Sequence, residues 1–238
     1  MGSEPRNNAE TFDSYAGTAY DDAVASAIRF SGQGHGFFLE AKVRWLLELV
    51  SRRVGDPADL ELLDFGCGVG LMDGLLVPNV KRLHGVDVSA AAIEVAARAN
   101  PDVSYTSYEG GGLPYEAGSF DVSFAVCVLH HVSPEDRPQV VSEMARVTRN
   151  GGLVVVFEHN PLNPLTRLVV SRIPFDDDAI LLGTREAAAL LAAAGLVGPE
   201  RRYILIAPWR LALLEPVERF LGPVPLGAQY YVAAAKHV

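Results

Sequence analysis

LLDFGCGVG, residues 62–70, is the stretch that decides the fold. The largely apolar run from Leu60 to Phe65 predicts a buried strand, and it leads directly into Gly66, Gly68 and Gly70. A strand followed by glycines and then a helix forms a tight turn whose backbone amides lie open beside a helix N-terminus. We therefore expect a ligand-binding site at this turn.

From this strand onward, short strand-like runs alternate with helix-like stretches, which is the pattern of a parallel sheet covered by helices on both faces. The fold class is therefore α/β. The last two strands are too close in sequence for a parallel crossover, so we expect them to form an antiparallel, hairpin-like edge. The predicted strands are residues 60–65, 82–87, 103–109, 119–129, 153–158, 201–207 and 228–236.

The composition is that of one globular domain, with 238 residues of which 49% are hydrophobic and 21% charged. The net charge of -9 argues against a nucleic-acid partner, because binding to phosphates depends on lysine and arginine. Apolar runs are too short for a membrane span, and residues 1–15 lack the apolar segment of a signal peptide, so a cytoplasmic location is predicted. A monomer or a homodimer would suit this length.

The glycine turn does not match a dinucleotide-binding fingerprint, because Leu71 stands where the third glycine of that pattern belongs. Instead, Asp64 precedes the first glycine, and Asp87 ends the next strand, where a carboxylate can accept hydrogen bonds from both ribose hydroxyls. In these features the chain resembles the class I S-adenosylmethionine-dependent methyltransferases. The motifs that carry the resemblance are LLDFGCGVG (62–70), GVDVS (85–89), GGGLPYEAGSFD (110–121), CVLHHV (127–132) and RVTRNGGLVVV (146–156).

The resemblance implies a Rossmann-like, doubly wound sheet of seven strands, mostly parallel, with an antiparallel final strand. It also implies an N-terminal helical lid over residues 1–58, a core over residues 59–238 and a substrate-cover insert over residues 159–183. The implied cofactor is S-adenosyl-L-methionine, released as S-adenosyl-L-homocysteine. The residues implied to bind it are Asp64, Gly66, Cys67, Gly68, Asp87, Val88, Glu109, Gly110 and Cys127.

Histidines and a carboxylate follow the fourth and fifth predicted strands, at the carboxyl edge of the sheet where open α/β folds bind ligands. His131 and His159 are the preferred catalytic pair, because an alcohol or phenol acceptor must lose its proton to a base. Further substrate contacts are predicted at Tyr20, His35, His130, Glu158 and Arg167. No metal ligands are predicted: Cys67 and Cys127 are too isolated for a zinc site, and the acidic run 176–178 is interpreted as a solvated loop face.

These observations predict methyl transfer to a small molecule, such as a sugar, a polysaccharide precursor or a secondary metabolite. The LHHV-like stretch at 129–132 is shared with relatives of the quinone-biosynthesis methyltransferases, which act on differing acceptors. Two alternatives are a non-catalytic S-adenosylmethionine-binding module and an NAD-dependent nucleotide-sugar oxidoreductase. The sequence leaves open which acceptor is used and whether oxygen, nitrogen or carbon is methylated.

Overall fold

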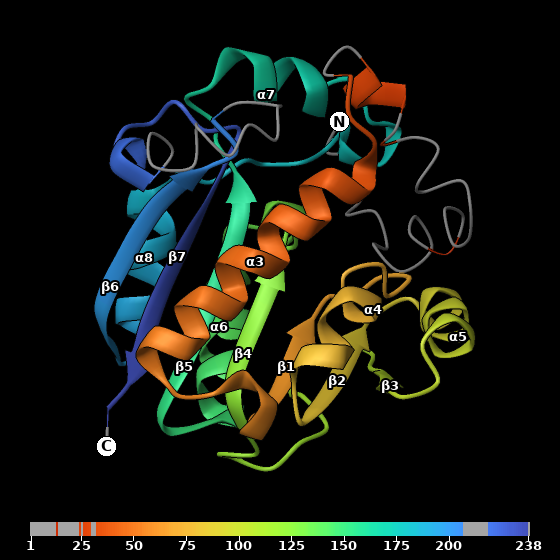
Figure 1. Ribbon diagram of the computed structural model, residues 1–238, viewed down its shortest axis with the longest axis vertical. Helices are drawn as coiled ribbons and strands as arrows, with labels where there is room; N and C mark the ends of the chain where they lie inside the picture. Colours follow the sequence, from red (N-terminus) through yellow and green to blue (C-terminus); the bar gives the residue numbers. More distant parts are fainter. Residues whose placement is uncertain (1–12, 14–23, 25, 30–31, 207–218, 238) are drawn as a thin grey trace.

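A single seven-stranded sheet forms the centre of the molecule (Figure 1). The structure, a computed structural model, describes residues 13, 24, 26–29, 32–206 and 219–237. The strand order is β3-β2-β1-β4-β5-β7-β6. The strands are β1 (Glu61–Phe65), β2 (Arg82–Asp87), β3 (Ser104–Ser107), β4 (Phe120–Val126), β5 (Thr148–His159), β6 (Leu196–Ile204) and β7 (Gln229–Lys236).

The sheet confirms the predicted topology. β1 to β5 pair in parallel, whereas β7 runs antiparallel to both of its neighbours, β5 and β6. The predicted hairpin-like edge is corrected in one respect, because β7 lies inside the sheet and only β6 forms the edge. β7 is suited to that place because Tyr230, Val232, Ala233 and Ala234 are buried.

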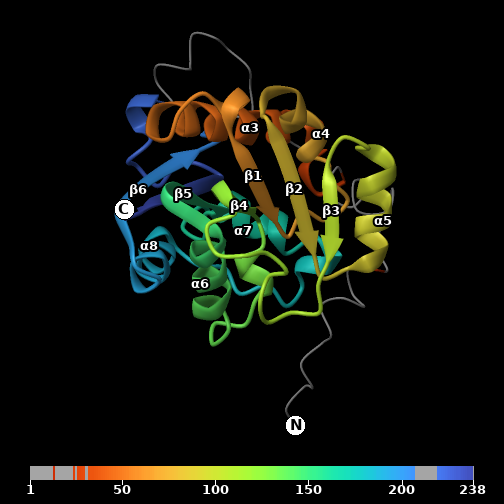
Figure 2. The same ribbon diagram turned by 90° about the horizontal axis from the view of Figure 1, so that it is seen from below.

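Helices cover both faces of the sheet, as Figure 2 shows from below. On one face lie α3 (His35–Arg53) and α4 (Asp73–Leu76), and on the other lie α6 (Arg137–Val147) and α8 (Thr184–Ala193). The remaining helix of the layers, α5 (Ala90–Ala99), contacts β2 and β3. Among the described residues, no helix is both long and apolar enough to cross a membrane.

Alternating residues of the strands feed two separate hydrophobic cores. Leu62 and Val155 belong to the core under α3, whereas Leu63 and Val154 belong to the core shared with α6 and α8. α3 itself buries Trp45, among others, in the first of these cores. The helix is therefore a structural layer of the domain, and the role of residues 1–58 as a lid remains a prediction.

Short helical segments connect the strands, and several of them lie at the carboxyl ends of the parallel strands. α7 (Pro164–Val170) lies above the carboxyl ends of the strands (Figure 1). Asn163 caps this helix, since its side chain accepts hydrogen bonds from the backbone amides of Leu165 and Thr166. The short 3-10 turns are η2 (Pro57–Asp59), η3 (Val77–Asn79), η4 (Leu129–His131) and η5 (Pro174–Asp176). Two of them, η4 and η5, help to build the site described next.

Candidate functional site

A cavity of about 380 Å³ opens at the carboxyl ends of the parallel strands. Its lining joins two groups of predicted residues that come from different strands. The predicted cofactor residues that line it are Asp64, Gly66, Cys67, Gly68, Asp87, Val88 and Cys127. The predicted acceptor residues that line it are His35, His130, His131 and His159.

The backbone of the glycine turn after β1 leaves no room for a side chain at Gly66. Gly66 has a φ of +76°, and a Cβ atom built on it would lie 2.5 Å from a methyl carbon of Val128. The amide of Gly68 donates a hydrogen bond to Asp87 Oδ2 at 2.8 Å, while the other oxygen of Asp87 accepts from the amide of Ser89 at 2.9 Å. Asp87 therefore ties the glycine turn to the end of β2, and each of its oxygens keeps a further lone pair for a ligand.

Two buried carboxyl groups, those of Asp64 and Asp73, lie beside this turn. Asp64 is 3% exposed, and its Oδ1 has no hydrogen-bond partner. Burial raises the pKa of Asp64 well above its usual value, and the neighbouring charge of Asp73 raises it further. Burial likewise raises the pKa of Asp73 to about 6. A cationic ligand would stabilise both carboxylates, so this end of the cavity suits a positively charged group.

Cys127 marks the end of β4 with an unusual backbone. Its φ of +59° lies in the left-handed region, which few residues other than glycine adopt. Its amide donates to the carbonyl of Phe157 at 2.8 Å, and Gln229 Nε2 donates to its sulfur at 3.4 Å. Burial raises the pKa of the Cys127 thiol, which favours the neutral form and argues against a nucleophilic role.

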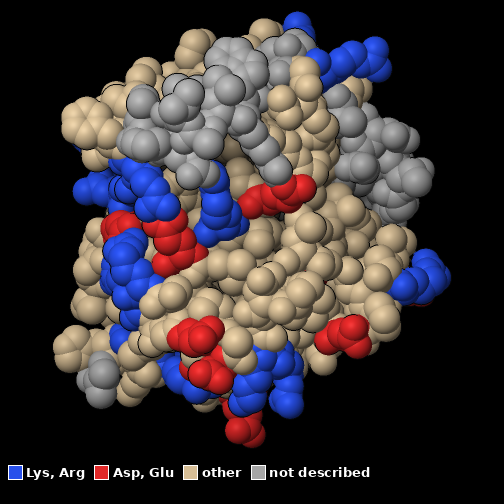
Figure 3. Space-filling model, in the orientation of Figure 1, with Lys and Arg blue, Asp and Glu red and all other residues tan. Residues whose placement is uncertain are grey.

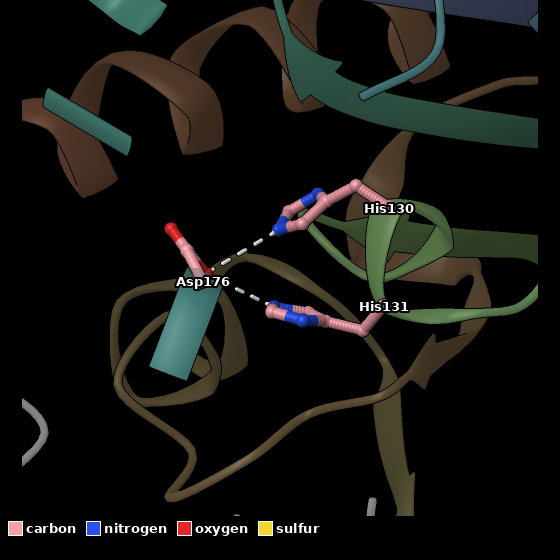
Figure 4. Close-up of side chains that lie close together, drawn as sticks. All are labelled: His130, His131 and Asp176. Carbon is pink, nitrogen blue, oxygen red and sulfur yellow. Dashed lines mark ion pairs between the residues drawn. The ribbon is translucent and has the colours of Figure 1, made fainter. Parts of the chain in front are cut away.

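Three histidines lie together across the cavity from the glycine turn. His130 and His131 belong to η4, and the ring of His130 lies 5.1 Å from that of His159 between centroids. His130 Nδ1 lies 2.6 Å from Glu158 Oε2. His131 Nε2 lies 3.3 Å from Asp176 Oδ1, and Figure 4 shows this pair. Burial, together with the neighbouring charge of His130, lowers the pKa of His159 to about 4, so His159 is neutral at pH 7.

Asp176 corrects the interpretation of the acidic run as a solvated loop face. Asp177 and Asp178 are exposed, but Asp176 is 5% exposed and lines the cavity. The reason is the apolar side chains on the same turn, since Phe175 and Ile173 pack with Ala27 in a small cluster of their own. Because Phe175 is buried, the neighbouring carboxylate of Asp176 is buried with it.

Glu158, a predicted substrate contact, lies behind the cavity wall and contacts the protein. It is completely buried and is not among the residues that line the cavity. Its Oε1 accepts hydrogen bonds from the amides of Val128 and Leu129, at 3.1 and 2.7 Å, while its Oε2 faces His130. Glu158 thereby fixes the η4 turn that carries the histidines.

Other predicted residues also lie away from the cavity. Glu109 and Gly110 are exposed and do not line it, because β3 ends at Ser107 and the chain then leaves the sheet. Arg167 is exposed on α7 and does not line it either. Tyr20 lies outside the described residues.

Lys42 and Tyr108 line the cavity without having been predicted. Lys42 is only 5% exposed, on the buried face of α3. The sequence carries a signal for it, because Lys42 precedes Leu46 by four residues and so stands in the apolar stripe of the helix. Tyr108 follows β3, and its amide donates to the carbonyl of Asp87 at 3.1 Å.

Charged side chains of both signs are mixed on the face of the molecule drawn in Figure 3. Arg52 and Arg53 pair with Glu200, and Arg219 pairs with Glu48. Among the described residues on this face, no continuous basic patch is visible.

Residues 63–156 match a family model described as a methyltransferase domain. The ubiquinone/menaquinone biosynthesis C-methyltransferase of Campylobacter jejuni is 30% identical over 107 residues, which make up 42% of this chain and 45% of that enzyme. The chain thus spans less than half the length of this curated relative.

Two crystal structures share the fold. An S-adenosylmethionine-dependent methyltransferase of Thermotoga maritima is similar with a TM-score of 0.70 and 19% identity, over 95% of this chain and 99% of that one. Geranyl diphosphate C-methyltransferase of Streptomyces coelicolor, bound to Mg²⁺, geranyl diphosphate and S-adenosyl-L-homocysteine, is similar with a TM-score of 0.59 and 20% identity. That match covers 81% of this chain and 79% of that one.

Proposed function

We propose that this chain, whose residues 63–156 match a methyltransferase domain model, is a class I S-adenosylmethionine-dependent methyltransferase that methylates a small, largely apolar acceptor. The observation that carries the proposal is the continuity of the cavity. Asp64 and Asp87 line the same space as His131 and His159, so a donor and an acceptor can be held side by side. Holding two reactants at near-attack distance supplies much of the rate of such a transfer.

The residues around the glycine turn fit the cofactor. When bound, S-adenosylmethionine supplies a methyl group on a positively charged sulfur, which departs as a neutral thioether. Asp87 would accept hydrogen bonds from the ribose hydroxyls. The buried Oδ1 of Asp64, which has no partner within the protein, would face the cationic methionine end.

The acceptor end of the cavity is mainly apolar. This supports an acceptor of the secondary-metabolite type over a sugar, because a sugar carries many hydroxyls that would each need a hydrogen-bond partner once buried. The quinone pathway in the name of the Campylobacter enzyme and the geranyl diphosphate bound by the Streptomyces enzyme agree with an apolar acceptor. The apolar residues on this side are Val24, Ile28, Phe38, Leu165, Val169, Ile173 and Phe175.

The acceptor needs a base when it is an alcohol or a phenol. We assign this role to His131, because Asp176 Oδ1 at 3.3 Å from its Nε2 would orient the ring and stabilise its protonated form. His159 would contact the same acceptor as a neutral imidazole. The predicted insert, residues 159–183, contributes Asp176 and the inner side of α7 to the cavity and would cover the acceptor.

Calorimetry with S-adenosylmethionine and with NAD tests the cofactor half of the proposal. We expect the full chain to bind the methyl donor and not NAD, and Asp87→Ala to weaken donor binding by at least about tenfold, as loss of a hydrogen bond to a charged group implies. Asp102→Ala, at an exposed acid in the following loop, is the matched control and should bind normally. Binding of NAD alone would reject the proposal.

Release of S-adenosylhomocysteine, measured over a panel of phenols, prenylated quinols and sugars, tests the acceptor half. Turnover with the apolar phenols or quinols is the expected result. Turnover with sugars only would reject the apolar acceptor. Donor binding without turnover of any acceptor would favour the non-catalytic binding module.

A further inference from the structure

His130, His131 and Asp176 form a compact cluster at the acceptor end of the cavity (Figure 4). One potential ligand atom from each residue lies within 4.8 Å of the other two. Asp176 Oδ1 is 3.3 Å from His131 Nε2 and 3.7 Å from His130 Nε2. The two imidazole nitrogens therefore converge on one carboxylate oxygen.

This oxygen lacks the hydrogen bonds that a buried carboxylate normally makes. Asp176 is 5% exposed, yet Oδ1 has no hydrogen-bond partner. The 3.7 Å separation from His130 is beyond hydrogen-bond distance, and the 3.3 Å separation from His131 is longer than the roughly 2.7–2.9 Å of a charged pair. The oxygen therefore makes two ion-pair contacts but no hydrogen bond, which costs free energy in a buried position.

The same separations suit ligands that share a metal ion. Bonds of about 2.0–2.1 Å in a tetrahedral arrangement place neighbouring ligand atoms roughly 3.3–3.4 Å apart. Both distances to Asp176 Oδ1 lie at or within a few tenths of an ångström of this value. The ligand atoms of the two histidines, which lie within 4.8 Å of each other, would move closer together around an ion.

Glu158 supplies the support that metal-binding histidines usually have. It lies 2.6 Å from His130 Nδ1, which fixes the ring and leaves Nε2 turned toward Asp176. Metal-ligating histidines commonly donate their second nitrogen to a carboxylate in this way. Glu158 is held in turn by the backbone amides of Val128 and Leu129.

We propose that His130, His131 and Asp176 bind a divalent transition-metal ion of the zinc type. The donor set of two imidazoles and one carboxylate favours such an ion over magnesium or calcium, which prefer oxygen ligands. All three residues line the cavity, so the remaining coordination position faces the space assigned to the acceptor. Structural zinc sites are closed by protein ligands, whereas this one would be open.

The role of the ion rests on the proposed function. A bound acceptor hydroxyl would coordinate the ion through its oxygen and lose its proton more readily. His131 Nε2 can hold either the ion or a proton, but not both at once. In the metal-loaded protein His131 would therefore not act as the base, and the ion would activate the acceptor instead. The proton would then pass from the coordinated hydroxyl to solvent.

Metal titration of the chelator-treated full chain tests the site without donor or acceptor. Calorimetry with Zn²⁺ and visible absorption with Co²⁺ should show one ion per chain. We expect Asp176→Asn to weaken binding by at least about 100-fold and Glu158→Gln by about 10- to 100-fold, as for supporting carboxylates elsewhere. Asp177→Asn, at the exposed neighbour of Asp176, is the matched control and should bind like the unchanged chain.

Equal binding by Asp176→Asn and Asp177→Asn, or no binding by the unchanged chain, would overturn the proposal. The cluster would then be a proton-holding network of His130 between two carboxylates. If Asp176→Asn does not fold, His131→Gln serves instead, with thermal unfolding of the metal-free variants as the check. If the chain binds zinc but not S-adenosylmethionine, the proposed function is rejected and the metal site is retained. If it binds S-adenosylmethionine but not zinc, the metal site is rejected and the proposed function is retained.

Discussion

The two ends of the cavity are built in different ways. At the cofactor end, Gly66, Gly68 and Asp87 belong to the ends of two neighbouring strands and the turn between them, and their contacts are mostly with backbone. At the acceptor end, His131 and Asp176 come from segments separated by the whole of α6 and β5. The first end is a local structure, whereas the second exists only because the insert folds back over the sheet.

The difference teaches which residues a short motif can reveal. A positive φ at Gly66 and a carboxylate after β2 leave a recognisable pattern over a few residues. A buried carboxylate such as Asp176 has no such pattern, because its environment depends on where Phe175 packs. Perturbing each end separately should therefore change different properties of the protein.

Replacing His131 should give the largest effect and should confine it to the acceptor end. We expect His131→Gln to lower kcat with a turned-over acceptor by about 10²- to 10⁴-fold, the usual contribution of a positioned base. S-adenosylmethionine affinity should stay within about twofold of the unchanged chain, since His131 lies among the acceptor residues. Turnover assays and calorimetry on the same preparation measure both values. A loss of donor affinity would show that the two ends are not separable.

Adding a methyl group at the glycine turn should disturb the cofactor end through its backbone. Gly66→Ala should lower the free energy of unfolding by about 1–3 kcal/mol, because Cβ would meet Val128 and a φ of +76° strains alanine. The double variant with Val128→Ala should recover part of this loss. Gly36→Ala is the matched control, since it has no atom within 4 Å of its Cβ and lies in a helix. Urea unfolding measures all of them, and equal stability of both glycine variants would contradict the prediction.

Changing the pH should give the smallest effect and again act at the cofactor end. Burial raises the pKa of Asp73 to about 6 and that of Asp64 well above its usual value, with Lys42 opposing the latter shift. A cation stabilises the ionised carboxylates, so donor affinity should be highest above these values and fall by up to about tenfold between pH 7 and pH 5.

Adenosine is the control for the pH series, because it keeps the ribose but lacks the charged methionine end. Burial also raises the pKa of Asp87, so adenosine binding reports any titration at the ribose itself. The difference between the two affinity curves, measured by calorimetry, isolates Asp64 and Asp73. If the affinities of S-adenosylmethionine and adenosine change with pH in the same way, groups other than Asp64 and Asp73 cause the pH dependence.

The strand pattern and the glycine turn were predictable because both are local. A buried strand appears in the sequence as an apolar run, and a turn that needs a positive φ usually contains glycine. Both patterns are independent of residues far away in the chain. The doubly wound, mostly parallel sheet of seven strands with an antiparallel final strand followed from the resemblance to a known family. The exact ends of the strands could not be predicted in this way. Glu109 was predicted to bind the cofactor, but β3 ends at Ser107 and Glu109 does not line the cavity.

The sequence by itself determined the α/β sheet, the turn at Gly66 and Gly68, and Asp87 beside it, since each depends on neighbouring residues along the chain. Tertiary structure decided the position of β7 inside the sheet, the support that Glu158 gives to His130, and the presence of Lys42 and Asp176 in the cavity. Irregular segments carry no periodic pattern, so the burial of a charged side chain there is set by packing between distant elements.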